Sequence, residues 1–197
     1  MRNWTSDPAV IRSGFRETFH SLGDPDFGEN GSGEDAERAW WRKVVERTAV
    51  SAGIDPADDL FEPCFADLFD HYAAGAAWKV FPEVEGVLRE VRAAGAKMAV
   101  VSNFDRRLHR VLDELGLTGC FDLVLTSADV AARKPSPKLL HEAVRRLDGH
   151  PEKTCLVGDS EGADGGSARS AGISCFILDR PRTTLRSYLE WLSENFS

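Results

Sequence analysis

Three short polar clusters in this sequence each follow an apolar run, and their side chains are suited to binding a phosphate group and a divalent cation. The first cluster is Ser102 and Asn103, at the end of the run 97–102. A hydroxyl, together with the free backbone N–H groups that open the following helix, is a typical ligand set for phosphate oxygens. Asp105, just beyond, is also typical of an ordinary helix cap, so this cluster alone is not specific.

The second cluster is a lysine held between prolines, in Arg133-Lys134-Pro135-Ser136-Pro137. Prolines stiffen a short loop and favour the first turn of the helix that follows. Such a loop would hold the Lys134 ammonium near the ends of the strands. Taken alone, Lys134 favours the interpretation as a solvated surface lysine, because lysines are usually exposed.

The third cluster is a pair of carboxylates, Asp159 and Asp164, directly after the apolar run 154–158. Two carboxylates at this spacing can converge on one hard cation, and Mg²⁺ prefers oxygen ligands while it keeps several waters. The alternative is that both aspartates only support a turn and a helix start. The metal site is favoured, because Asp159 directly follows an apolar run that predicts a buried strand.

The elements that must position these clusters alternate between strand and helix after residue 78. The apolar runs predict strands at 97–102, 121–126, 154–158 and 174–178, and helices at 82–94, 105–115, 137–147, 161–171 and 184–194. This alternation is typical of a parallel sheet with right-handed crossovers. Ligands of such sheets bind beyond the carboxyl ends of the strands, where all three clusters fall.

Before residue 78 the sequence shows only helical signals. We predict a helix that begins near Ser6 or Asp7, then helices at 34–49 and 56–74, with a turn-rich loop at 23–33. The predicted organisation is a helical domain at 1–78 and an α/β domain at 79–197. Trp40 and Trp41 could anchor a protein partner, but their helical spacing favours packing inside the protein.

Composition and charge exclude several classes of function. The chain has 197 residues, 42% of them hydrophobic, with a formal net charge of -8, so we expect no nucleic acid or anionic membrane as a partner. No apolar stretch approaches the roughly 20 residues that span a bilayer. Four cysteines without C-x-x-C spacing argue against a disulfide scaffold or a zinc site. We therefore expect an intracellular location, cytoplasmic or organellar.

The order hydroxyl, lysine, paired carboxylates resembles the haloacid dehalogenase-like (HAD) hydrolase superfamily. Ser102 matches its second motif, Lys134 its third, and Asp159 with Asp164 its fourth. The resemblance implies an α/β fold, a Rossmann-like parallel sheet core of the HAD type with an N-terminal helical cap of the C1 type. It also implies a Mg²⁺-dependent phosphatase of a small phosphorylated metabolite, working through an aspartyl-phosphate.

The resemblance also assigns roles to individual residues. Ser102 and Asn103 would bind the phosphate, and the catalytic Lys134 would neutralise both the phosphate and the nucleophile. Asp159 would ligate Mg²⁺, while Asp164 would ligate the metal or orient its waters. The substrate itself is not readable from the sequence.

The superfamily's first motif, an apolar strand ending in Asp-x-Asp-x-Thr, has no clear counterpart here. The one Asp-x-Asp, Asp24-Pro25-Asp26, follows a helical pattern and is interpreted as a turn. The resemblance therefore implies that the central first strand is missing, which would leave two facing strand edges unpaired between 97–102 and 154–158. We expect an N-terminally incomplete and inactive form.

Two alternatives stay open at this point. The first is a non-catalytic remnant that binds phosphate or a protein partner. The second is a haloacid dehalogenase, whose reaction also passes through a covalent intermediate with the enzyme. Dehalogenation needs no metal, so the carboxylate pair at Asp159 and Asp164 favours the phosphatase.

Overall fold

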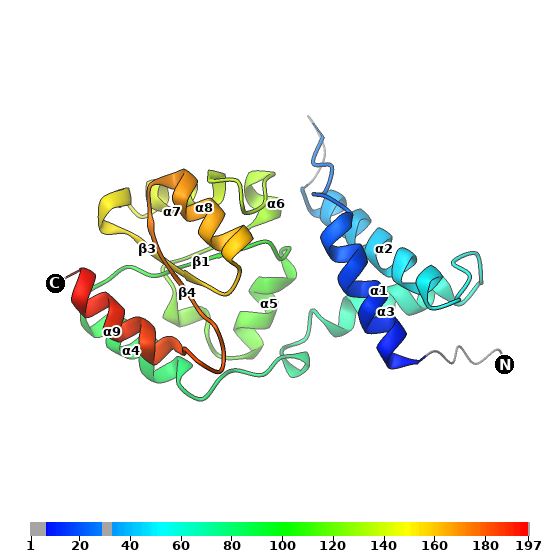
Figure 1. Cartoon of the computed structure of the whole chain (residues 1–197), viewed down its shortest axis with the longest axis horizontal. Helices are drawn as coiled ribbons and strands as arrows, with labels where there is room; N and C mark the ends of the chain where they lie inside the picture. Colours follow the sequence, from blue (N-terminus) through cyan, green and yellow to red (C-terminus); the bar gives the residue numbers. More distant parts are fainter. Residues whose placement is uncertain (1–6, 29–32, 197) are drawn as a thin grey trace. The chain divides into compact units, whose positions relative to one another are not determined.

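The backbone of the computed structural model falls into two units that divide between Ala73 and Ala74, five residues before the predicted boundary (Figure 1). The structure describes residues 7–28 and 33–196. The first unit is helical and the second is α/β, and each is described by itself below. None of the helices in the described residues combines the length and apolarity needed to cross a bilayer.

The first unit contains three helices: α1 (Pro8–Ser21), α2 (Gly33–Ser51) and α3 (Phe61–His71). Asp7 caps α1, because its Oδ1 accepts a hydrogen bond of 2.8 Å from the Ala9 N–H, and Pro8 occupies the first turn. The core of this unit includes the buried apolar side chains of Trp40, Val44, Phe61 and Phe65.

The third predicted helix begins five residues later than expected, at Phe61 instead of Pro56. The side chain of Asp55 accepts a hydrogen bond from the Ala57 N–H, and that of Asp58 accepts one from the Leu60 N–H. Short polar side chains that bond their own backbone offer the chain an alternative to helix. The prediction was therefore wrong for residues 56–60, where these turns replace the helix.

Trp40 packs inside the first unit. Its side chain is 4% exposed, and its Nε1 donates a hydrogen bond of 2.7 Å to the Gly23 carbonyl. The ring meets Phe19 and Trp41 edge-on, at centroid distances of 5.5 and 5.0 Å. Trp40 is thus part of the packing of this unit and does not offer its ring at the surface.

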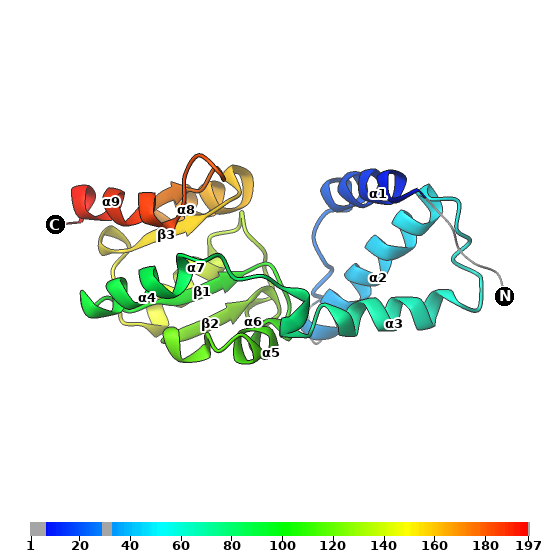
Figure 2. The ribbon, with the colours of Figure 1, turned by 90° about the horizontal axis from the view of Figure 1, so that it is seen from below.

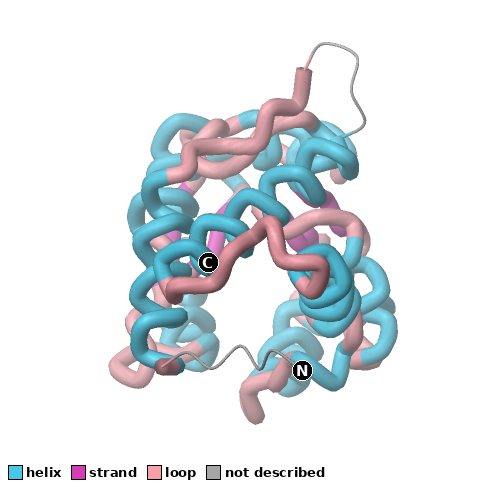
Figure 3. The backbone as a smooth tube through the Cα atoms, turned by 90° about the vertical axis from the view of Figure 1, so that its right-hand side faces the viewer, coloured by secondary structure: helices cyan, strands magenta, loops and turns pink. Residues whose placement is uncertain are grey.

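The second unit follows the predicted alternation of strands and helices. Its strands are β1 (Ala99–Ser102), β2 (Leu123–Thr126), β3 (Cys155–Gly158) and β4 (Ser174–Ile177), each four residues long (Figure 3). Its main helices are α4 (Val84–Ala93), α5 (Arg107–Glu114), α6 (Ser127–Val130), α7 (Lys138–Arg146), α8 (Gly166–Ala171) and α9 (Leu185–Asn195). A π-helical turn, η4 (Glu161–Gly165), directly precedes α8.

The strands form two separate parallel pairs instead of one sheet. β1 pairs with β2, with Ala99 opposite Leu123, and β3 pairs with β4, with Cys155 opposite Ser174. Figure 2 shows β2, β1 and β3 in that order. Within the described residues no strand joins β1 to β3.

Helices cover the strands. On one side, Leu140 of α7 and Ala168 of α8 form a buried apolar cluster that also contacts Val101 of β1 and Leu156 of β3. α4 packs against α9, and Glu90 pairs there with Arg186. The apolar cluster of these helices therefore contacts both strand pairs. The backbone hydrogen bonds, by contrast, do not connect one pair to the other.

Candidate phosphate and metal site

The first cluster lies at the carboxyl end of β1, as predicted. Ser102 is the last residue of the strand, and its Oγ accepts a hydrogen bond of 3.0 Å from the Phe104 N–H. Asp105, 2% exposed, accepts a hydrogen bond of 3.0 Å from the Arg107 N–H at the start of α5. These bonds fix the turn, and the Ser102 hydroxyl keeps its own proton for a ligand.

The Asn103 side chain holds the lysine loop in place. Its Oδ1 accepts a hydrogen bond of 2.7 Å from the Lys134 N–H, and its Nδ2 donates one of 2.9 Å to the Lys134 carbonyl. Arg133, which is 6% exposed, donates from Nη2 to the Asn103 carbonyl at 3.1 Å. The predicted phosphate ligand Asn103 thus has both ends of its amide bonded to the backbone of Lys134.

Lys134 connects the two strand pairs. Its Nζ donates one hydrogen bond of 2.8 Å to the Val101 carbonyl and another of 2.6 Å to Asp164 Oδ1. The side chains of Lys134 and Asp164 are only 11% and 6% exposed. An ammonium carries three protons, so the third can be donated to an anion.

Asp164 is held from two directions. While Oδ1 binds Lys134, Oδ2 accepts a hydrogen bond of 3.0 Å from the Ser160 N–H. The Ser160 hydroxyl in turn accepts one from the Ala163 N–H at the start of η4. Gly158 is required beside this carboxylate, because a Cβ there would lie 2.3 Å from Asp164 Cγ.

Asp159 is exposed and makes no side-chain hydrogen bond or ion pair within the described residues. No group of three or more His, Cys, Asp or Glu residues in the described part of the chain forms a closed metal cage. Mg²⁺ does not need one, since it is usually held by one or two carboxylates with waters and substrate oxygens. Asp159 therefore fits as a direct ligand, and Asp164, whose two oxygens each already accept a hydrogen bond, fits better as a group that orients the metal's waters.

The thiol nearest to this site is not a nucleophile at neutral pH. Cys175 of β4 packs against the apolar cluster of Leu140 and Ala168. Burial, together with the negative charges of Asp164 and Glu161, raises the pKa of the Cys175 thiol to about 11. The reactive species is the thiolate, so this cysteine stays inert.

The structure brings Ser102, Asn103, Lys134 and Asp164 together, and Asp159 follows β3 at the same edge. Sequence reasoning missed the direct Lys134–Asp164 pair and the role of Arg133, because neither has a local signal. Asp24 and Asp26 lie in the loop after α1, in the other unit, and no strand precedes them between Asp7 and that loop.

The chain is similar to known hydrolases in sequence. The profile of the haloacid dehalogenase-like hydrolases matches residues 10–172. Human haloacid dehalogenase-like hydrolase domain-containing protein 3 is 34% identical over 181 residues, which cover 89% of this chain and 70% of the relative. The bovine protein of the same name is 37% identical, and the chain spans 56% of its length. A phosphoglycolate phosphatase of Pseudomonas putida is 30% identical over 78% of this chain and 59% of the relative.

Solved structures show the same fold. A putative β-phosphoglucomutase from Thermotoga maritima superposes with a TM-score of 0.62 at 22% identity, over 96% of this chain and 88% of that one. The L-2-haloacid dehalogenase of Xanthobacter autotrophicus gives 0.62 at 21% identity, over 95% and 70% of the two chains. The sequence matches and the shared fold lead to one conclusion: the chain belongs to the haloacid dehalogenase-like hydrolase family.

Proposed function

We propose that the edge formed by Ser102, Lys134 and Asp159 binds the phosphoryl group of a small phosphomonoester together with Mg²⁺. The observation that carries this proposal is the environment of Lys134. Two of its three ammonium protons are fixed by Val101 and Asp164. The third is available to neutralise a phosphate oxygen, and Ser102 is the residue that follows Val101 at the end of β1.

Each side chain then has a defined task. Ser102 donates its hydroxyl proton to one phosphate oxygen, and Lys134 donates its third proton to another. Asn103 positions Lys134 through its two bonds to the lysine backbone. Asp159 would hold Mg²⁺ and Asp164 would orient the metal's waters; when bound, the metal would neutralise negative charge on the phosphoryl oxygens.

Turnover needs one more group. The described residues contain no strand that ends in the Asp-x-Asp of the family's first motif, so the covalent chemistry implied by the resemblance has no nucleophile among them. We infer that this chain binds phosphate without hydrolysing phosphomonoesters at an enzymatic rate. In a form that carries the first motif, we expect a Mg²⁺-dependent phosphatase.

The test is a titration of the chain with inorganic phosphate, with and without Mg²⁺, followed by calorimetry. We expect saturable binding that strengthens with Mg²⁺ and weakens at least tenfold in Ser102→Ala and in Lys134→Met. The control is Lys138→Met, which removes the same charge from an exposed position four residues away. Equal affinity in all variants would overturn the site.

Activity assays on the same preparations separate the remaining alternatives. We expect no release of phosphate from p-nitrophenyl phosphate and no release of chloride from 2-chloropropionate. Phosphate release by the chain itself would overturn the inferred inactivity. Chloride release without metal would favour a dehalogenase over the proposed phosphatase.

A further inference from the structure

Residues 78–81 carry large apolar side chains that are exposed to solvent. Trp78 is 43% exposed, Val80 37% and Phe81 52%. Exposed apolar side chains are usually scattered singly over a protein surface, and several that lie together often mark a binding site. We call these three side chains the apolar rim, and their place in the second unit decides what they can bind.

The first end of the apolar rim lies beside the turn that follows β1. The Trp78 ring meets the Phe104 ring edge-on, with the centroids 5.7 Å apart and an interplanar angle of 76°. Phe104 is two residues beyond Ser102, and its N–H donates the hydrogen bond that the Ser102 Oγ accepts. The Arg107 guanidinium lies 4.9 Å from the centre of the Phe104 ring and is paired with Asp105, which holds this ring in place. Trp78 therefore contacts the same turn that holds the Ser102 hydroxyl.

The chain before Trp78 runs along α5 toward this edge. The Gly75 N–H donates a hydrogen bond of 2.7 Å to Oε2 of Glu114, the last residue of α5. A Cβ on Gly75 would lie 2.7 Å from the Glu114 Cβ, so the backbone lies directly on the helix there. Trp78, three residues later, contacts Phe104, which precedes Arg107 at the start of the same helix. Because α5 begins just beyond β1, the segment reaches the carboxyl end of that strand.

The second end of the apolar rim lies beside the residues that follow β4. The Arg180 guanidinium lies over the Phe81 ring, 3.7 Å from its centroid, and forms an ion pair of 2.6 Å with Glu83. Arg180 is three residues beyond Ile177, the last residue of β4. The proposed phosphate and metal ligands follow β1 and β3, and β3 is paired with β4. The apolar rim and these ligands therefore share one edge of the second unit.

The two sets of side chains suit different parts of one ligand. The strand ends supply a hydroxyl, an ammonium and a carboxylate, which suit a phosphoryl group and its metal. The apolar rim supplies ring faces and methyl groups with few hydrogen-bonding atoms. A polyhydroxylated group would lose water there without finding new partners, which costs free energy. An aromatic or apolar group would instead bury apolar surface and stack on a ring.

We propose that the apolar rim binds the organic group of the phosphomonoester and selects esters in which that group is aromatic or apolar. This inference rests on the proposed phosphate site. Trp78 is the main specificity-determining residue, because it has the largest side chain of the rim and contacts the turn that holds Ser102. Its packing on Phe104, and that of Phe81 under Arg180, holds the rings before a ligand binds, so that little side-chain freedom is lost on binding.

Calorimetric titration of the full chain in a buffer that contains Mg²⁺ measures this selection. The probes are phenyl phosphate, glycerol 3-phosphate and inorganic phosphate. We expect the wild type to bind phenyl phosphate about tenfold more tightly than glycerol 3-phosphate. Trp78→Ala should reduce this ratio to about twofold, and Trp78→Leu, which keeps an apolar side chain against Phe104 but removes the ring, should reduce it about threefold. Both variants should bind inorganic phosphate as the wild type does.

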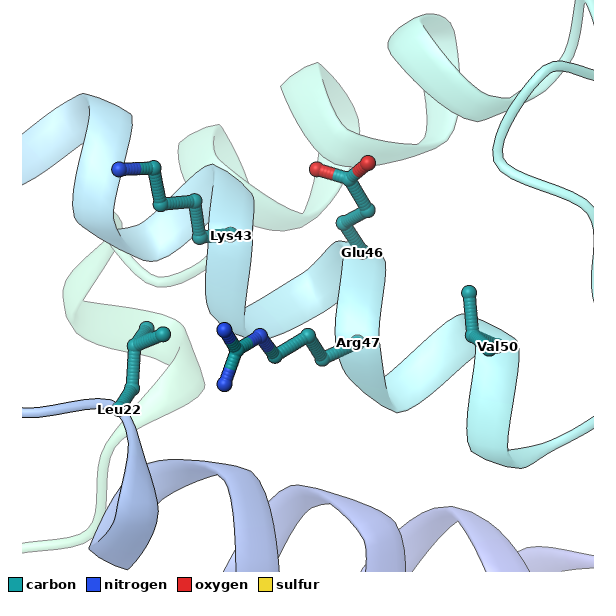
Figure 4. Close-up of a pocket in the computed structure, with 5 residues that line it drawn as sticks. All are labelled: Leu22, Lys43, Glu46, Arg47 and Val50. Atoms are coloured by element: carbon teal, nitrogen blue, oxygen red, sulfur yellow. The ribbon is translucent and has the colours of Figure 1, made fainter.

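Two control variants lie in the first unit. Phe15→Ala removes a ring of matching exposure, 42%, and should leave the ratio unchanged. A second place where an anion could bind is a groove lined by Leu22, Lys43, Glu46, Arg47 and Val50 (Figure 4). Arg47→Met removes a cation from this groove and should leave every affinity unchanged. Weaker binding of phenyl phosphate by Arg47→Met would place the ester in the groove and overturn the inference.

The remaining outcomes separate this inference from the proposed function. Equal affinity of the wild type for the two esters would overturn the inference, while binding of inorganic phosphate would still support the proposed function. An unchanged ratio in Trp78→Ala would also overturn the inference. If Trp78→Ala does not fold, Trp78→Leu decides, and an unchanged ratio there has the same meaning. No binding of inorganic phosphate by the wild type would overturn the proposed function and, with it, this inference.

Discussion

Replacing Lys134 by Met tests whether the bridge between the two strand pairs stabilises the fold. The change removes a charged hydrogen bond to Asp164 and a second bond to the Val101 carbonyl. Hydrogen bonds to charged groups contribute about 1.5–3 kcal/mol, and breaking a buried ion pair costs roughly 3–5 kcal/mol. Since both side chains are nearly buried, at 11% and 6% exposure, we expect a loss of about 3 kcal/mol in the free energy of unfolding.

Urea denaturation followed by circular dichroism measures this loss. With a slope of about 2 kcal/mol per molar urea, the midpoint should fall by roughly 1.5 M. Asp164→Asn should also destabilise the chain, and the double variant should lose about 2 kcal/mol less than the sum of the two single variants. Lys138→Met, at an exposed position, should stay within about 0.5 kcal/mol of the wild type. A coupling energy below about 0.5 kcal/mol would refute the bridge.

Three further substitutions test the packing and the charges of the second unit. Gly158→Ala should lower the urea midpoint because the new Cβ displaces Asp164, whereas Gly162→Ala, which has open space around it, should not; equal midpoints would contradict this contact. Leu139→Ala should lower the free energy of unfolding by about 2–5 kcal/mol, since this side chain is 0% exposed. A decrease of less than about 1 kcal/mol would show that neighbouring side chains fill the space that Leu139 leaves. Two arginines hold the pKa of Glu142 at about 2, so its stabilising effect is present above pH 4.5 and is lost as the pH falls toward 2. The difference in urea midpoint between wild type and Glu142→Gln should therefore shrink from pH 6 to pH 3, and a constant difference would argue against the ion pairs.

The succession of strands and helices in the second unit was predictable because each element carries its own local signal. Short apolar runs define the strands, and glycines such as Gly116 and Gly172, both with positive φ, end the helices before them. The predicted first strand began two residues too early. The Met98 N–H instead donates to the Asp122 side chain, and the ladder begins at Ala99.

The pairing of side chains at the site was not predictable from the sequence. Asn103 and Lys134 are 31 residues apart, and Lys134 and Asp164 are 30 apart. The position of each residue in the sequence predicts which strand it follows. Which of their atoms come into contact depends on how the strand ends are arranged in space. The sequence therefore predicted that these residues follow their strands, but it did not predict that the Asn103 side chain bonds the backbone of Lys134.

The two hydrogen bonds of the Asn103 side chain make the site sensitive to deamidation of this one residue. Deamidation would replace the Nδ2 donor with a carboxylate oxygen, which only accepts hydrogen bonds. That oxygen would then face the Lys134 carbonyl, another acceptor, at the 2.9 Å separation that Nδ2 now occupies. One of the two bonds that position the Lys134 loop would then be replaced by a repulsive contact. A stored preparation could thus lose anion binding while its helices and strands remain folded.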